Sequence, residues 1–158
     1  MQKFFANTIV FIAAGSLGLP AFALPPQAKS EQTRKSCETA IADSRGRIER
    51  GKDITVTTDI ADYSEIYPNH PSGRPLFVTI IVDGNAADSV MLSPVFQKAI
   101  ASEIIKSCGS VAAVTFGRQE TDWSITFGVM SGGKIESFEC IDPEPEGNRI
   151  PWGQQICI

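Results

Sequence analysis

The chain has 158 residues, of which 42% are hydrophobic and 20% charged, and its formal net charge is −4. This length suits one domain and leaves no room for two ordinary ones. The lysines and arginines are dispersed, so the basic patch that nucleic-acid binding requires is missing and no nucleic-acid partner is expected.

The first 23 residues are typical of a cleaved secretory signal peptide. Lys3 precedes an apolar run over residues 9–14, a stretch of small residues, and Ala-Phe-Ala at residues 21–23, which fits a cleavage site. The apolar run is too short to cross a membrane. An uncleaved N-terminal anchor is the alternative. We therefore expect a secreted or periplasmic protein with no transmembrane segment after cleavage.

The region after the signal peptide divides into a leader and one domain. Residues 24–33 are polar, contain two prolines and show no apolar period, which predicts a disordered leader. A single domain over residues 34–158 follows. In residues 34–50 the apolar side chains recur at helical spacing, so we expect a surface helix with a narrow buried face, ending at Gly51.

Two strands and a long loop are predicted next. Residues 54–60 are rich in β-branched side chains that partly alternate with polar ones, which favours a strand with one solvated face. Residues 76–82 are almost continuously apolar, as in a central strand. The loop between these strands is rich in proline and unusually long for a compact domain.

The second half of the domain has the clearest helix. Ser93 is an N-cap candidate, Pro94 fits the first helical position, and Gly109 fits the stop. The apolar positions between them share one face: Phe96, Ala99, Ile100, Ile104 and Cys108. Three strands are then predicted, over residues 111–117, 123–129 and 134–141.

The predicted order is helix, two strands, helix, three strands. Consecutive strands can pair through hairpins, and both helices can cover the same face of the sheet. The expected fold is therefore an α+β two-layer sandwich, with an antiparallel sheet of about five strands and two helices on one face.

Four cysteines follow the leader: Cys37, Cys108, Cys140 and Cys157. An even number in an exported protein predicts two disulfides, and the spacing matches no zinc site. Three connectivities are possible, and we favour two particular pairs. Cys37 could reach Cys108 if the helices pack antiparallel. A bond between Cys140 and Cys157 would hold a tail poor in apolar residues, contributing about 3 kcal/mol by loop closure.

The only histidine, His70, lies in the long proline-rich loop. A histidine can act as a general base when a carboxylate orients it and a nucleophile is near, and Asp62, Ser64 and Glu65 are close in sequence. No nucleophile motif accompanies it. A small hydrolase using His70 is therefore an alternative hypothesis, against an ordinary exposed loop residue.

A group of oxygen-bearing residues lies at the end of the second predicted strand. Asp83, Asn85 and Asp88 surround Gly84, and clustered oxygens are what calcium prefers. The spacing fails the EF-hand pattern, and Asp or Asn beside glycine is commoner as a plain turn. No metal site is expected.

The segment between the next two strands places Arg118 close to Trp123. A guanidinium offers paired donors and an indole a flat apolar face, so the two could bind a small anion or a sugar. In the simpler interpretation, which we favour, Arg118 pairs with Glu120 or Asp122 and Trp123 enters the core. Trp152, in the proline-rich tail, is expected to close one end of the core.

The last seventy residues show a pattern that matches a known group. Its positions are Ser93-Pro94, Cys108, Val114, Phe116-Gly117-Arg118, Thr121-Asp122-Trp123, Phe127-Gly128, Phe138, Cys140, Pro151-Trp152-Gly153 and Cys157. This pattern resembles small exported cyanobacterial proteins of uncharacterised function. The resemblance implies export and a shared fold, and it transfers no site residues.

No phosphate-binding glycine loop, Rossmann fingerprint or pair of metal-binding histidines occurs after the signal peptide, so no cofactor is expected. The leading hypothesis is an exported, non-enzymatic module that binds another protein or an envelope component. The hydrolase at His70 and the ligand site at Arg118 and Trp123 are the alternatives.

Overall fold

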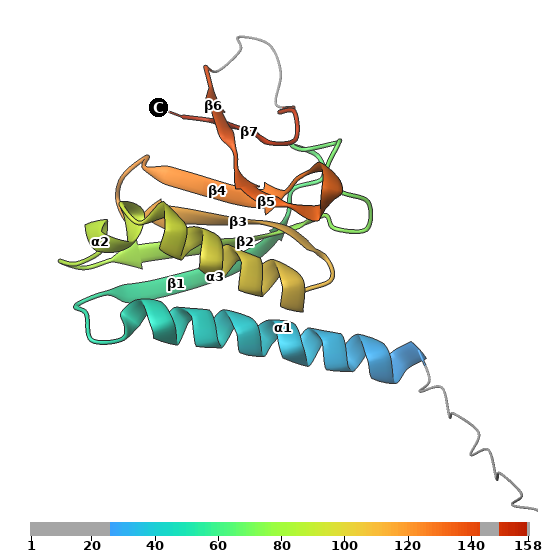
Figure 1. Ribbon diagram of the computed structural model, residues 1–158, viewed down its shortest axis with the longest axis horizontal. Helices are drawn as coiled ribbons and strands as arrows, with labels where there is room; N and C mark the ends of the chain where they lie inside the picture. The colour runs from blue at the N-terminus through green and yellow to red at the C-terminus, as the bar shows by residue number, and fades with distance from the viewer. Residues whose placement is uncertain (1–25, 143–148, 158) are drawn as a thin grey trace, which may run out of the picture.

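The computed structural model describes residues 26–142 and 149–157 (Figure 1). The predicted signal peptide, residues 1–23, lies outside them. In chain order the elements are α1 (Pro26–Glu49), β1 (Thr55–Asp62), β2 (Leu76–Asp83), α2 (Asp88–Met91), α3 (Pro94–Ser107), β3 (Val111–Arg118), β4 (Ser124–Val129), the short 3₁₀ helix η1 (Ser131–Gly133), β5 (Ile135–Ser137), β6 (Glu139–Ile141) and β7 (Gln154–Ile156). No helix in the described ranges is long and apolar enough to cross a membrane.

Five strands form one sheet in the order β1-β2-β3-β4-β5. The α+β class, the five strands and the two main helices on one face are confirmed, but the sheet is mixed rather than antiparallel. β2 and β3 pair in parallel, whereas the other neighbours are antiparallel. The reason is topological: α3 carries the chain back to the edge where β2 began, so the next strand must run the same way.

The strand predicted over residues 134–141 is two strands. β5 pairs with β4, and the chain then leaves the sheet after Phe138, whose N–H donates to the carbonyl of Thr126 (2.8 Å). β6 pairs in parallel with β7 to form a separate two-stranded sheet. The break follows from Phe138, which turns its ring onto the sheet face opposite the helices and is buried there.

The first helix starts earlier than the sequence suggested. α1 begins at Pro26, so most of the predicted leader, residues 24–33, is helical. Propensity explains this difference, since residues 27–33 are mostly good helix formers although they have no apolar face. In Figure 1 this first part of α1 runs past the end of the sheet.

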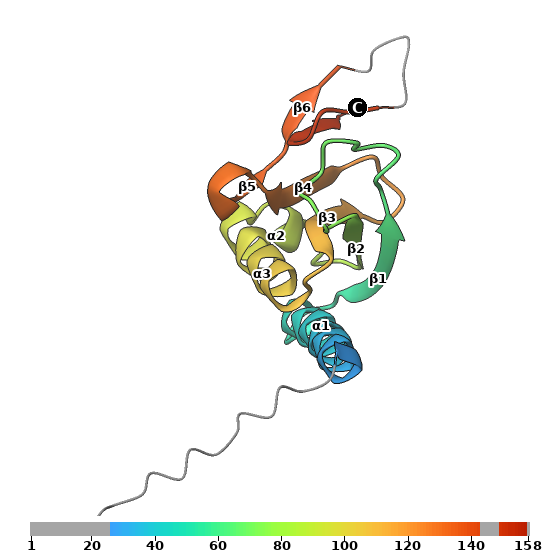
Figure 2. The same cartoon turned by 90° about the vertical axis from the view of Figure 1, so that its right-hand side faces the viewer.

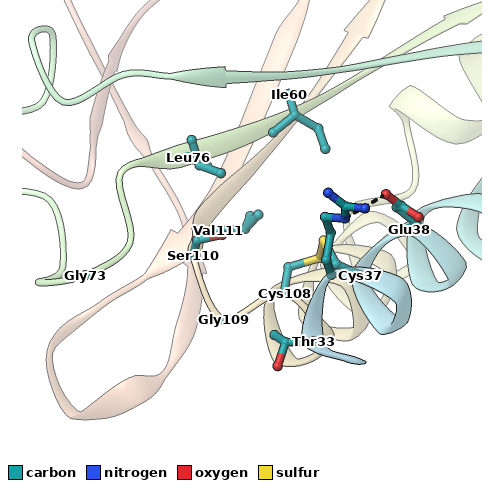
Figure 3. Close-up of a pocket in the computed structure, with 11 residues that line it drawn as sticks. Thr33, Cys37, Glu38, Ile60, Gly73, Leu76, Cys108, Gly109, Ser110 and Val111 are labelled. Atoms are coloured by element: carbon teal, nitrogen blue, oxygen red, sulfur yellow. Dashed lines mark ion pairs between the residues drawn. A yellow bond between two sulfur atoms is a disulfide. The ribbon is translucent and has the colours of Figure 1, made fainter. Parts of the chain in front are cut away.

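Both predicted disulfides are present. Cys37 in α1 is bonded to Cys108 at the end of α3, with 4.6 Å between their Cα atoms (Figure 3). Cys140 in β6 is bonded to Cys157 just after β7, with 5.4 Å between the Cα atoms. The first bond joins the two main helices, and the second ties the tail to the two-stranded sheet.

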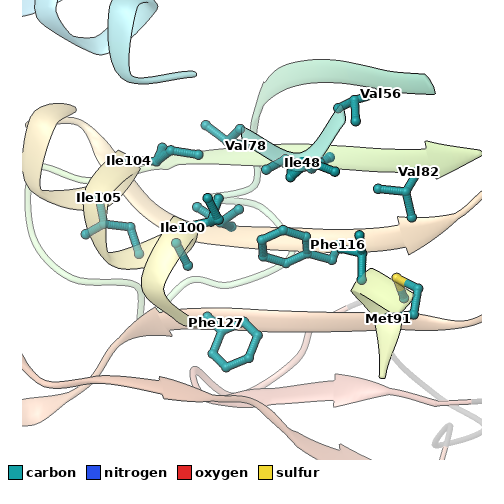
Figure 4. Close-up of a cluster of buried hydrophobic side chains, with 14 of the residues drawn as sticks. Ile48, Val56, Val78, Val82, Met91, Ile100, Ile104, Ile105, Phe116 and Phe127 are labelled. Atoms are coloured by element: carbon teal, nitrogen blue, oxygen red, sulfur yellow. The ribbon is translucent and has the colours of Figure 1, made fainter. Parts of the chain in front are cut away.

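The main core lies between the two helices and the sheet (Figure 4). Alternate residues of β2 face it, because side chains of a strand alternate between its faces. In β3 the register shifts by one residue near Ala112, so Val111, Val114 and Phe116 face the core. Its fully buried members include Ile48, Val78, Ile80, Val82, Met91, Ile100, Ile104, Val111, Val114 and Phe116. Burying each such side chain stabilises the fold by roughly 1.5–3 kcal/mol, so this face provides most of the apolar burial.

A second, aromatic cluster covers part of the opposite face. Figure 2 shows the helices on one side of the sheet, and the 63–75 loop with β6 and β7 on the other. Tyr67 of the loop stacks on Phe77 of β2 with ring centroids 5.1 Å apart, and Trp152 meets Phe138 edge-on at 5.0 Å. The long loop is therefore ordered because it covers apolar sheet residues.

Candidate functional site

A largely apolar hollow of the described surface is a groove between α1 and the sheet, with a volume of about 770 Å³ (Figure 3). Ile60, Leu76 and Val111 line it from the strands, and the Cys37–Cys108 disulfide lines it from the helices. The remaining lining residues are Thr33, Arg34, Glu38, Gly73, Gly109 and Ser110.

The groove exists because α1 has no large apolar side chain at this level. On the helix-facing side of β1, Val56 is covered and only 2% exposed, whereas Ile60 is 45% exposed. α1 carries no large apolar residue before Ile41, so at the level of Ile60 the helix offers only small or polar side chains. The apolar side chains of the strands are left facing an open space.

One wall of the groove is held by Arg74. Its guanidinium Nη1 donates to the carbonyl oxygens of Ile105 (3.1 Å) and Val111 (2.8 Å), and lies 3.5 Å from that of Cys108. A cation near the C-terminal end of a helix satisfies its free carbonyls and complements its dipole. Arg74 therefore fixes the turn between α3 and β3 beside the disulfide.

The rim of the groove is polar and open to solvent. Arg34 and Glu38 form an ion pair one helical turn apart, with 3.7 Å between Nε and Oε1. Both side chains are more than two-thirds exposed. Such a pair contributes little to stability.

His70 lies in the 63–75 loop away from this groove. Its Nδ1 is 2.9 Å from the carbonyl oxygen of Pro71, which can only accept, so Nδ1 carries the proton. The carboxylate of Asp62 accepts instead from the N–H of Ser64 (2.8 Å). Hydrogen bonds from Ser64 lower the pKa of Asp62, and the charge of His70 adds a weaker effect. Within the described ranges no hydroxyl is hydrogen-bonded to the imidazole, so the structure does not assemble the hydrolase constellation.

Arg118, the last residue of β3, and Trp123, which directly precedes β4, are neighbours, since the N–H of Arg118 donates to the carbonyl of Trp123 (3.0 Å). The guanidinium of Arg118 pairs with Asp88 of α2, with 2.6 Å between Nε and Oδ1, and not with the expected Glu120 or Asp122. Trp123 does not enter the core and is 36% exposed. It lines a smaller hollow of about 450 Å³ that excludes Arg118.

Trp152 packs against the aromatic cluster rather than closing the main core. Its ring N–H donates to the carbonyl of Val129 (2.8 Å), and its ring lies 5.7 Å from that of Tyr67. Both polar and apolar parts of the indole are therefore used within the fold.

The oxygen-rich segment after β2 forms a turn. Asp83 accepts from the N–H of Gly84 (2.7 Å), and Asn85 donates to Asp53 (2.6 Å). Within the described part of the chain, no three or more His, Cys, Asp or Glu side chains are grouped so that they could hold a metal ion.

Comparisons with known proteins identify no relative: no family model matches the chain, nor does any curated protein or solved structure. The groove, which sequence reasoning missed, is thus the feature to interpret on its own geometry. The sequence gives one signal of it. The first half of α1 lacks large apolar residues, whereas the strands that it faces carry them.

Proposed function

We propose that this protein is a non-enzymatic binding module that works outside the cytoplasm and holds part of another protein in the groove between α1 and β1. The observation that carries the proposal is the groove itself. Its volume is within the usual range of binding sites, and three aliphatic side chains from separate strands converge on it.

Two of the polar side chains considered for chemistry, Arg118 and Asp62, are engaged in contacts within the fold. Arg118 is paired with Asp88, and Asp62 with Ser64. Those groups therefore support a binding role better than a reaction.

A protein partner fits the groove better than a small molecule. Small-molecule sites fix their ligand with a few buried polar groups, whereas the charged side chains here, Arg34 and Glu38, are paired at the exposed rim. An open apolar groove with a polar rim is the pattern of protein interaction sites.

The location outside the cytoplasm is supported by the cysteines. All four are in disulfides, which persist in oxidising compartments and are rare in the cytosol. The signal-peptide pattern of residues 1–23 points the same way.

The test is selection from a displayed library of random 12-residue peptides, panned against the purified, oxidised protein. Ile60→Glu places a charge in the groove, and Ile156→Glu is its matched control, because Ile156 in β7 is similarly exposed at 39%. We expect peptides that bind the wild type and the control but lose at least tenfold in affinity for Ile60→Glu. Failure of repeated selections to yield any peptide that distinguishes these two variants contradicts the proposal.

A further inference from the structure

The strand beside the groove has a free edge. β1 is the outermost strand of the sheet, so one side of its backbone has no neighbouring strand. The N–H of Tyr63 donates to the carbonyl of Pro75, and 63 opposes 75 when the β1–β2 register is continued. In an antiparallel ladder every second residue bonds to its partner, so the N–H and C=O groups of Thr58, Ile60 and Asp62 point outward.

At the start of β1 one outward backbone group already has a hydrogen-bond partner. The N–H of Val56, which also points outward, donates to the Glu49 carboxylate at the end of α1 (3.1 Å). The stretch from Thr58 to Asp62 remains, about 17 Å long. It contains no proline, lysine or bulge, three of the devices that stop a strand from pairing with another chain, and its only charges are the carboxylates of Asp59 and Asp62.

The free edge of β1 and the groove meet at one residue. Ile60 belongs to both, because its backbone points outward and its side chain lines the groove. A strand added to β1 would place the residue opposite Ile60 on the same face of the sheet, and so over the groove. Strand addition of this kind, in which main-chain hydrogen bonds are combined with a pocket for a side chain, is a recurring mode of peptide recognition.

The charge along this edge is acidic. Asp59 and Asp62 are both exposed, and neither forms an ion pair with another described residue. Hydrogen bonds from Ser64 lower the pKa of Asp62, so it stays charged at neutral pH. An added strand with lysine or arginine opposite these positions gains attraction.

A second copy of the chain fits this edge poorly. In a symmetric antiparallel pairing centred on Asp59, the two Asp59 carboxylates face each other directly, and in one centred on Ile60 they lie diagonally. Like charges at such positions destabilise a strand pair.

We propose that the occupant of the groove is an extended, basic segment of a different protein, which adds to β1 along Thr58 to Asp62 and places one aliphatic side chain against Ile60. This inference rests on the proposed function and adds to it the conformation and charge of the partner segment.

The test uses three capped nine-residue peptides and the purified, oxidised protein labelled with ¹⁵N. The first peptide has the central sequence Lys-Val-Leu-Lys-Val, which in an antiparallel pairing with leucine opposite Ile60 places its lysines opposite Asp59 and Asp62. The second replaces each lysine by glutamate, and the third is the first with N-methyl groups on alternate backbone nitrogens. We expect the basic peptide to bind and to shift the amide signals of β1. We expect the other two to bind at least tenfold more weakly.

Two protein variants complete the test. Thr58→Pro removes an outward N–H without touching the ladder to β2, whereas Thr58→Val keeps that N–H and is its control. The double variant Asp59→Lys, Asp62→Lys should reverse the preference, so that the glutamate peptide binds more tightly than the lysine peptide. A reversal of this kind cannot come from misfolding.

The outcomes separate the two proposals. If library peptides require Ile60 while N-methylation and Thr58→Pro have no effect, the groove binds proteins but strand addition is wrong. If the basic peptide fails to bind while the protein dimerises through β1, the occupant is a second copy. If no peptide of any kind distinguishes Ile60→Glu from Ile156→Glu, the proposed function falls together with this inference.

Discussion

The side chain of Gln155 is hydrogen-bonded to the backbone of Thr126, with 3.0 Å between its Oε1 and the N–H nitrogen. Its Nε2 donates in turn to the carbonyl oxygen of Ser124 (3.3 Å). β4 pairs with β3 on one side along this stretch, but on the other side β5 pairs with it only from Phe127 onward, so that side of Ser124 to Thr126 has no neighbouring strand. A single buried side chain of β7 therefore takes the place of a strand there.

Replacing Gln155 by methionine should destabilise the protein by about 1–3 kcal/mol. Methionine fills the space but leaves the N–H of Thr126 and the carbonyl of Ser124 without their partner. Gln154→Met, at the neighbouring position of β7, is the control. Urea unfolding followed by circular dichroism measures both, and equal unfolding midpoints would contradict the assigned role of Gln155.

Gly128 in β4 should not tolerate alanine. A Cβ atom there would overlap the ring of Phe138 and lie 3.0 Å from the ring of Trp152, so we expect a loss of about 1–3 kcal/mol. Gly46 in α1 provides the contrast, because a Cβ added there meets no atom within 4 Å. Gly46→Ala should stabilise the protein by up to about 1 kcal/mol. Thermal unfolding of the two variants should shift in opposite directions.

Arg74 should contribute more to the stability of the fold than its position in a loop suggests. Arg74→Met removes the donor that serves the carbonyls of Ile105 and Val111, and the expected loss is about 1.5–3 kcal/mol. Arg74→Lys should recover part of it, and the exposed Arg50→Met should cost little. Denaturant unfolding measures all three. A loss for Arg50→Met equal to that for Arg74→Met would show that only net charge matters.

Tyr67 should make stability fall at high pH. Burial in the aromatic cluster raises the pKa of Tyr67 to about 12, while an unfolded tyrosine has a pKa of about 10. The folded state therefore holds this proton more tightly, and its contribution to stability is complete below about pH 10 and is lost as the pH rises toward 12. Absorbance at 295 nm should show one delayed tyrosinate step. Tyr67→Phe should remove that step, and its persistence would assign it to another group.

Much of the fold follows from local sequence patterns. The apolar face from Phe96 to Cys108 predicts α3, and the proline-rich tail after Cys140 predicts the disulfide that holds it. Patterns of this kind do not fix strand direction. The parallel pairing of β2 with β3 depends on where α3 returns the chain, and the break at Phe138 depends on a cluster formed by distant segments.

The candidate site was not predictable in the same way. Sequence reasoning selects residues that carry chemistry, which here are His70, Arg118 and Trp123. The structure joins Arg118 and Trp123 only through their backbones, with their side chains in different surroundings, and it places His70 in the 63–75 loop. The groove is made of ordinary aliphatic residues, Ile60 and Leu76 among them, separated along the chain. It arises from side chains that α1 lacks, and an absence becomes informative only once the helix is placed against the strands.

The two disulfides also determine how the molecule can be stretched. Tension applied between the two ends of the chain passes from Cys37 directly to Cys108, and from Cys140 directly to Cys157. The segment holding β1 and β2 therefore cannot lengthen while the first bond is intact. Only residues 109–139 can extend between the two bonds, to a contour length of about 110 Å. The Cys37–Cys108 bond would stay intact while β3, β4 and β5 are pulled apart, so the distance between the two disulfides has a fixed upper limit.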